Sequence, residues 1–196
     1  GSSLIYMVDD LIKKSGHPKS GFYLNNLAEL SETIKELESK GQKVILFGVT
    51  YALLDLAAQY PQHLKHTIIM ETGGMKGKRK ELLKEEIHQL LQDAFLTENI
   101  HSEYGMTELL SQSYSKGKNI FKSPPWMKIL VRDVNDPLSI MGDNKKGGIN
   151  VIDLANIHSC PFVATQDLGC TFEDGTFSVL GRFSNADLRG CNLLIQ

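Results

Sequence analysis

Apolar residues recur every three or four positions through much of the first half of the chain, with charged residues between them. This spacing is typical of helices that bury one face and expose the other. It predicts helices over residues 26–40, 51–60 and 79–95. Gly41 and Pro61 end the first two, because glycine and proline both interrupt helices.

Two short apolar runs alternate with these helices. Lys43–Val49 and Thr67–Glu71 are rich in strand-forming residues and predict buried strands. Alternating strands and helices favour a parallel sheet covered by helices, in which ligands bind beyond the carboxyl ends of the strands. We therefore expect the glycine loop at 72–76, which follows the second strand, to share one site with the segment at Tyr104.

The pattern changes after Pro124–Pro125 to short strands and turns. Residues 127–132 and 149–154 predict strands. Asp174–Gly175, set between alternating apolar residues, predicts a β-hairpin over 172–180.

These patterns predict an α/β fold with a parallel sheet and helices in the N-terminal part and mostly antiparallel β-structure in the C-terminal part. We expect residues 1–122 to form an α/β nucleotide-binding subdomain and residues 123–196 to form a β-rich subdomain.

Composition and charge narrow the classes of function. The chain has 196 residues, 41% of them hydrophobic, which is ordinary for a globular protein. A net charge of −2 gives no reason to expect nucleic acid as a partner. The longest apolar runs fall well short of the roughly 20 residues that cross a bilayer, so we expect no integral membrane segment.

The cysteines argue for a reducing compartment. Cys160, Cys170 and Cys191 are odd in number, which argues against a disulfide framework, and Cys160 and Cys170 lack the spacing of a zinc site. We expect no secretory signal, since Leu4–Val8 is too short for one and two aspartates follow it. We expect a cytoplasmic protein.

Tyr104–Glu108, with the sequence Tyr-Gly-Met-Thr-Glu, is the segment richest in chemistry. An aromatic ring can stack on a base, a hydroxyl can donate to phosphate, and a carboxylate can bind Mg²⁺. In the alternative interpretation Tyr104 packs and Glu108 opens a helix.

Three other segments give this one a context. They are Gly73–Gly77, Thr165–Gly169 and Gly181–Arg182. From about residue 44 to the end, the order and spacing of these segments resemble the adenylate-forming superfamily, which includes the acyl- and aryl-CoA ligases. In that superfamily a Tyr-Gly-x-Thr-Glu segment touches adenine, phosphate and metal, an aspartate holds the ribose hydroxyls, and a Gly-Arg pair adds a ribose or phosphate contact.

The resemblance implies ATP or AMP and Mg²⁺ as cofactors, with Thr107 and Glu108 as catalytic residues and Glu108 as the metal ligand. It implies nucleotide contacts from Gly73, Gly74, Met75, Tyr104, Gly105, Met106, Thr107, Asp167 and Arg182.

Simpler roles remain open for three of these segments. Gly73–Gly74 can be an ordinary turn between strand and helix, and Asp167 can cap a turn before Gly169. Arg182 can pair with Glu173 or Asp174.

The ending, Arg182–Asn192, resembles most closely the acyl-protein synthetases, also called long-chain-fatty-acid–luciferin-component ligases, with the phenylacetate-CoA ligases next. In the acyl-protein synthetases a cysteine near the carboxyl end accepts the acyl group, which implies a catalytic Cys191. Neighbouring Arg189 favours its thiolate. The alternative is a buried, unreactive thiol. The resemblance implies activation of a fatty acid or other carboxylic acid as acyl-adenylate, with acyltransferase and acyl reductase partners.

Two features of the superfamily lack a match. No Ser/Thr/Gly-rich phosphate loop precedes the first predicted strand, and no large C-terminal lobe follows the hinge-like ending. We expect the chain to be the C-terminal portion of a longer enzyme, weakly active alone. The alternatives are an acyl- or aryl-CoA ligase, an acyl transfer enzyme of envelope polysaccharide biosynthesis, and a non-catalytic nucleotide-binding remnant.

Overall fold

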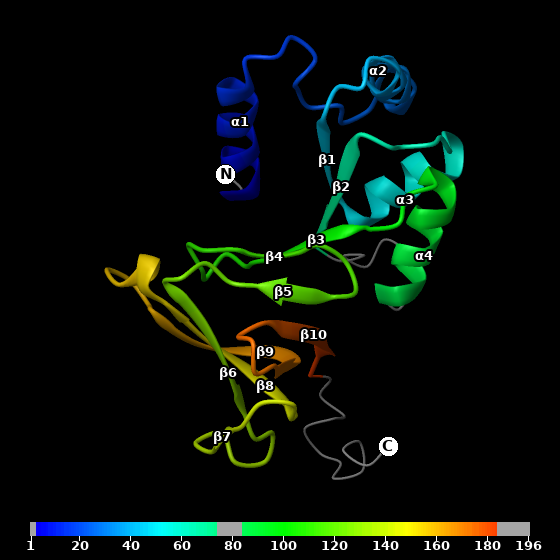
Figure 1. Ribbon diagram of the computed structural model, residues 1–196. Coiled ribbons are helices and arrows are strands. Elements are labelled where there is room, and N and C mark those ends of the chain that lie inside the picture. Colours follow the sequence, from blue (N-terminus) through cyan, green and yellow to red (C-terminus); the bar gives the residue numbers. More distant parts are fainter. Residues whose placement is uncertain (1–2, 74–83, 184–196) are drawn as a thin grey trace. The chain divides into compact units, whose positions relative to one another are not determined.

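The computed structural model describes residues 3–73 and 84–183 (Figure 1). Contacts divide the chain into two compact units, Gly1–Ile100 and His101–Gln196. The subdomain boundary expected after residue 122 stays a prediction.

The first unit contains helices and two parallel strands. Its elements are α1 (Ser3–Ser15), α2 (Leu27–Ser39), β1 (Val44–Val49), α3 (Thr50–Gln59), β2 (Thr67–Thr72) and α4 (Lys84–Phe95). Strands β1 and β2 pair in parallel from Val44 opposite Thr67 to Val49 opposite Thr72. The predicted helices and strands of this region are confirmed, except that residues 79–83 of the third helix lie outside the described residues.

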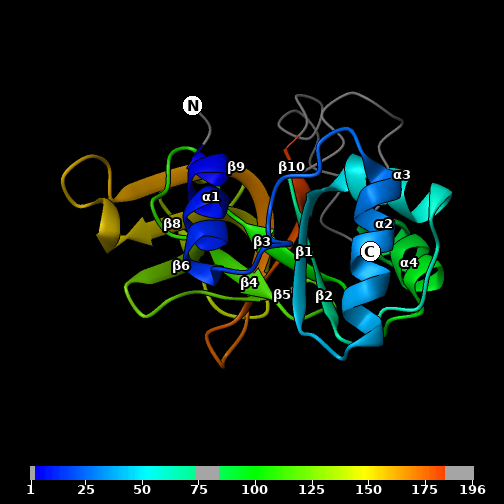
Figure 2. The ribbon, with the colours of Figure 1, turned by 90° about the horizontal axis from the view of Figure 1, so that it is seen from above.

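Helices α2, α3 and α4 lie on one side of β1 and β2 (Figure 2). The face of the strands that carries Leu46 and Ile69 packs against them. Alternate residues point to the opposite face, where Ile45 and Ile68 are exposed. The core of the unit joins Leu46 and Ile69 to helix residues that include Ile34, Leu53, Leu56, Ile87, Leu91 and Phe95.

The second unit is antiparallel. Its strands are β3 (His101–Tyr104), β4 (Ser113–Ser115), β5 (Ile120–Lys122), β6 (Met127–Arg132), β7 (Ile140–Met141), β8 (Lys146–Asp153), β9 (Phe162–Thr171) and β10 (Phe177–Arg182). They lie side by side in the order β3-β4-β5-β10-β9-β8-β6-β7, and every neighbouring pair is antiparallel (Figure 1). This confirms the predicted change from a parallel to an antiparallel part.

Three aromatic rings lie at the centre of the second unit. Tyr104 packs edge-on against Phe121 and Phe177, with ring centroids 6.0 and 5.6 Å away. Phe121 and Phe177 stack at 5.4 Å. Apolar side chains from β6 and β8 complete this core. The last residue of β3 is therefore fixed by packing.

Sequence patterns missed several elements. Helix α1 was not predicted, and β3, β4, β5 and β7 are only two to four residues long, too short for an alternating pattern to show. Strand β9 contains Thr165–Gly169, which was interpreted by its motif alone. Among the described helices, none is long and apolar enough to cross a membrane.

Candidate functional site

Asp167 on β9 joins two residues that are distant in the sequence. The Tyr104 hydroxyl donates to its Oδ2 at 2.9 Å, and the Arg182 Nε lies 3.2 Å from its Oδ1. Asp167 and Tyr104 are each 8% exposed, whereas the side chain of Arg182 is 75% exposed. The structure therefore brings together three of the residues that the motifs predicted for nucleotide binding.

A β-bulge sets the pairing of Asp167 with Arg182. Val179 lies opposite Gly169, but Gly181 lies opposite Leu168, so Leu180 is an extra residue on β10. Gly181 has φ +143°, a region that favours glycine. The extra residue moves Arg182 opposite Asp167. Bulges commonly re-aim side chains near functional sites.

A second irregularity lies between β9 and β8, where the register shifts between Gly148 and Asn150. The Arg132 guanidinium donates to the carbonyls of Ile149 and Thr165 at 2.8 and 2.6 Å. These bonds satisfy carbonyl groups at the position where the regular ladder is interrupted. Arg132 therefore supports the part of β9 that carries the site, a role that no motif indicated.

Gly169 is required by close packing. A Cβ atom at this position would lie 2.6 Å from the carbonyl oxygen of Ser178 and 2.6 Å from Cδ1 of Ile149. Asp167 lies within β9, so the alternative in which it caps a turn is wrong. Arg182 contacts Asp167, while Asp174 accepts hydrogen bonds from Thr176 within the hairpin turn.

The ring of Tyr104 presents little surface to a ligand, because it is packed against two phenylalanines. Burial, the negative charge of Asp167 and the hydrogen bond to it raise the pKa of Tyr104, so the phenol stays protonated and donates. The alternative interpretation, in which Tyr104 packs in the core, is correct for its ring. The hydroxyl of Tyr104 nevertheless contacts Asp167, the residue predicted to bind the ribose.

Thr107 and Glu108 are exposed in a turn that is closed by a hydrogen bond from Leu109 N to Met106 O at 3.1 Å. Glu108 therefore does not open a helix. Leu109 is buried and anchors the turn in the core. Within residues 3–73 and 84–183, no group of three or more His, Cys, Asp or Glu side chains is arranged to hold a metal.

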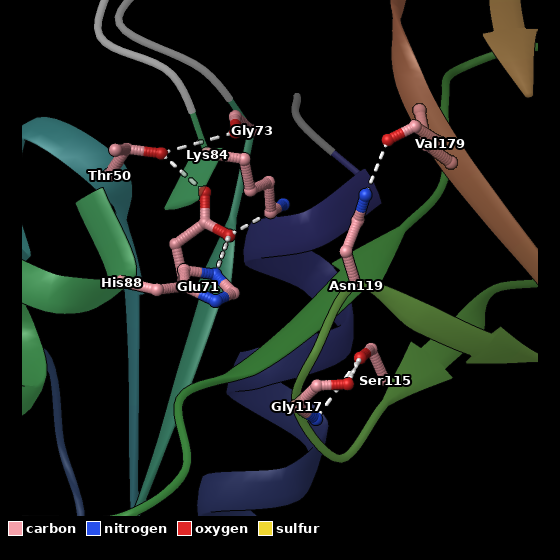
Figure 3. A network of polar contacts seen from close by, with 9 residues as sticks. All are labelled: Thr50, Glu71, Gly73, Lys84, His88, Ser115, Gly117, Asn119 and Val179. Carbon is pink, nitrogen blue, oxygen red and sulfur yellow. Dashed lines mark hydrogen bonds and ion pairs between the residues drawn. The ribbon is translucent and has the colours of Figure 1, made fainter. Parts of the chain in front are cut away.

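Glu71 is the centre of a buried polar network in the first unit (Figure 3). The Thr50 hydroxyl donates to its Oε1 at 2.5 Å, and Lys84 Nζ lies 2.9 Å from its Oε2. His88 Nε2 lies 3.9 Å from the same oxygen. The Thr50 hydroxyl also lies 3.2 Å from the carbonyl oxygen of Gly73. The network therefore ties the carboxyl ends of β1 and β2 to the start of α4.

The surroundings of Glu71 decide its protonation state. Burial alone would raise its pKa, but the hydrogen bond from His88, the charge of Lys84 and the hydrogen bonds from Thr50 and Lys84 lower the pKa to about 2. A buried ionised glutamate is thus fully paired. The apolar run at Thr67–Glu71 placed Glu71 in a strand but gave no sign of this network.

The glycine loop and the ending are only partly described. Gly73 has φ +73°, a conformation that favours glycine. Gly74, Met75 and Cys191 lie outside the described residues, so their predicted roles stay predictions.

Comparison with known proteins supports the fold. The chain matches no family model and no curated protein sequence. Rhodopseudomonas palustris MatB, solved with ATP bound, matches with a TM-score of 0.56 and 18% identity over 78% of this chain and 33% of MatB. Coronafacic acid ligase from Pectobacterium brasiliense matches with a TM-score of 0.55 and 19% identity over 80% of this chain and 32% of the ligase.

A third match is the o-succinylbenzoate CoA synthetase of Bacillus subtilis, with a TM-score of 0.54 and 19% identity over 80% of this chain and 34% of the synthetase. The chain therefore shares its fold with a part of each of these three proteins. The chain spans about a third of the length of each of these proteins. At this level of identity the matches show a shared fold and do not select the acyl-protein synthetases.

Proposed function

We propose that the chain takes part in ATP-dependent activation of a carboxylic acid as its acyl-adenylate, as the C-terminal portion of a longer enzyme. The observation that carries this proposal is the contact of Asp167 with Tyr104 and Arg182, made by residues from three separate motifs. The fold shared with ATP-bound MatB and with two carboxylic acid ligases supports it.

Asp167 is suited to bind the ribose. An ionised carboxylate has about four acceptor positions, and Tyr104 and Arg182 occupy two of them. In the part of the chain that the structure describes, two positions remain, and these match the vicinal hydroxyls of a ribose. Arg182, mostly exposed, is free to turn toward a ribose or phosphate oxygen while Tyr104 keeps Asp167 in place.

Thr107 and Glu108 would act on the phosphates. The substrate carboxylate attacks the α-phosphorus of ATP, and the bond from that phosphorus to the pyrophosphate oxygen breaks. Charge accumulates on the phosphate oxygens, where a hydroxyl donor and Mg²⁺ lower the barrier. We assign the hydroxyl to Thr107 and the metal ligand to Glu108, with Gly73, Gly74, Met75, Gly105 and Met106 lining the nucleotide.

We assign the acid to the fatty acids because the ending resembles the acyl-protein synthetases. A thiolate then attacks the carbonyl carbon of the acyl-adenylate, and AMP leaves. Cys191 is the proposed thiol, and an acyltransferase and an acyl reductase are the proposed partners.

Pyrophosphate release tests the proposal. The chain is incubated with ATP, Mg²⁺ and a long-chain fatty acid, in parallel with Glu108→Ala and with Glu173→Ala, a matched change of an exposed carboxylate in the β9–β10 turn. We expect Glu108→Ala to lower release at least tenfold and Glu173→Ala to leave it unchanged. Equal rates in all three proteins would overturn the role of Glu108.

A CoA ligase is the second candidate, because two matched proteins are a CoA synthetase and an acid ligase. Formation of acyl-CoA when coenzyme A is added would favour it. ATP binding without release of pyrophosphate for any acid would favour the non-catalytic remnant.

A further inference from the structure

The backbone that follows Glu108 is anchored by a fully buried carboxylate. Oδ2 of Asp153 accepts hydrogen bonds from the amides of Leu110 and Ser111 at 3.0 and 2.9 Å. Its Oδ1 accepts from the Ser111 hydroxyl at 2.7 Å and from the amide of Ala155 at 3.1 Å. Asp153 is 0% exposed. All four acceptor positions of the carboxylate are thus used, three of them by the segment after Glu108.

Asn156 holds the turn itself. This residue is 6% exposed and ends the short 3₁₀ helix η1 (Leu154–Asn156). Its side-chain amide donates to the carbonyl of Glu108 at 2.8 Å and to the carbonyl of Cys160 at 2.9 Å. The side chain of Glu108 is therefore exposed, while its backbone carbonyl is held by a hydrogen bond from a buried residue.

We infer that Asp153 and Asn156 are positioning residues that hold the Thr107–Glu108 turn in its phosphate-binding conformation. This inference rests on the proposed function. The contrast in exposure supports it: Thr107 and Glu108 face solvent, while the groups that fix their backbone are buried. Fixed donors and metal ligands lose less entropy when the nucleotide binds and need no rearrangement during the reaction.

Trp126 supplies a reporter for this segment. It is the only tryptophan of the chain, and its indole Nε1 donates to the Ser111 hydroxyl at 2.9 Å. The hydroxyl in turn donates to Asp153. Movement of the Glu108–Ser111 backbone changes the surroundings of the indole, so tryptophan fluorescence is sensitive to the position of this segment.

The test compares Asn156→Asp with Asn119→Asp. Both asparagines lie in the second unit and donate a side-chain amide to a backbone carbonyl; the bond from Asn119 goes to Val179 (Figure 3). Each substitution replaces a donor by a carboxylate that faces a carbonyl. If both variants lose structure, the cause is a general loss of folding. If only Asn156→Asp changes, the effect is on the Thr107–Glu108 turn.

Hydrogen exchange without nucleotide is the first measurement. We expect the amides of Leu110 and Ser111 to exchange at least tenfold faster in Asn156→Asp than in the wild type, and at the wild-type rate in Asn119→Asp, with a matching change in Trp126 emission. If Asn156→Asp does not fold, Asn156→Ser takes its place. Unchanged exchange overturns the inference, whatever nucleotide does.

Kinetics with ATP and Mg²⁺ is the second measurement. We expect Asn156→Asp to lower kcat for pyrophosphate release at least tenfold, with less than a threefold change in the KM for the fatty acid. If the wild type binds no ATP, the proposed function fails and this role fails with it. If the wild type releases pyrophosphate and Asn156→Asp equals it, only the positioning role is overturned.

Discussion

At the scale of single residues, motifs indicated which side chains meet but not how they meet. Tyr104, Asp167 and Arg182 were predicted from the order of their motifs, and the structure joins them by two contacts. The bulge at Leu180 that aligns Arg182 with Asp167 depends on pairing between strands, which a single sequence does not specify. The buried ring of Tyr104 likewise depends on Phe121 and Phe177, which carry no motif.

Tyr104→Phe tests the contact with Asp167. The ring keeps its packing, but a buried carboxylate loses a donor, which costs roughly 1–3 kcal/mol. We expect the affinity for ATP, measured by calorimetry, to fall roughly tenfold, because Asp167 is no longer held for the ribose. Tyr114→Phe is the control, since its hydroxyl donates to Glu103 at the exposed side of β4. Equal affinities of the two variants would show that the Tyr104 hydroxyl has no part in binding.

At the scale of elements, an apolar run predicted β2 and helical spacing predicted most of α4, but neither predicted the charged residue that joins them. Glu71 occupies an inward position of β2, where alternation predicts an apolar residue. Its carboxylate is satisfied by Thr50 from α3 and by Lys84 and His88 from α4. Such a network forms only when several elements have assembled, so no local pattern reveals it.

The low pKa of Glu71 makes stability depend on pH. With a pKa of about 2 in the folded protein and 4.5 ordinarily, the folded state binds fewer protons between these values. Ionised Glu71 therefore contributes about 3 kcal/mol to the free energy of unfolding above pH 4.5, and this contribution is lost as the pH falls toward 2. We expect urea unfolding to show that the free energy of unfolding of Glu71→Gln falls less than that of the wild type when the pH is lowered from 4.5 toward 2. Glu85→Gln, an exposed change on α4, should show the wild-type fall. A wild-type pH dependence in Glu71→Gln would contradict the assignment.

At the scale of the whole molecule, the sequence predicted a parallel α/β part followed by a mostly antiparallel part, and the structure has a parallel and an antiparallel unit. This was predictable because buried parallel strands form continuous apolar runs, whereas hairpins carry turn signals. The acyl acceptor was not predictable in the same way, because the reactivity of a thiol depends on its exposure and surroundings. Among the cysteines in the described part of the chain, Cys160 is exposed and Cys170 is buried.

Acyl labelling separates these thiols. Burial raises the pKa of Cys170, with Asp143 acting in the same direction and Lys146 against it, which disfavours the thiolate that attacks an acyl-adenylate. After incubation with ATP, Mg²⁺ and a radiolabelled fatty acid, we expect a label that hydroxylamine removes and that is lost in Cys191→Ser. Cys160→Ser is the matched control and should keep the label, because exposure alone does not place a thiol beside the adenylate. Label that persists in Cys191→Ser and disappears in Cys160→Ser would move the acceptor role to Cys160. Acyl-CoA formed without any protein label would instead assign the chain to the CoA ligases.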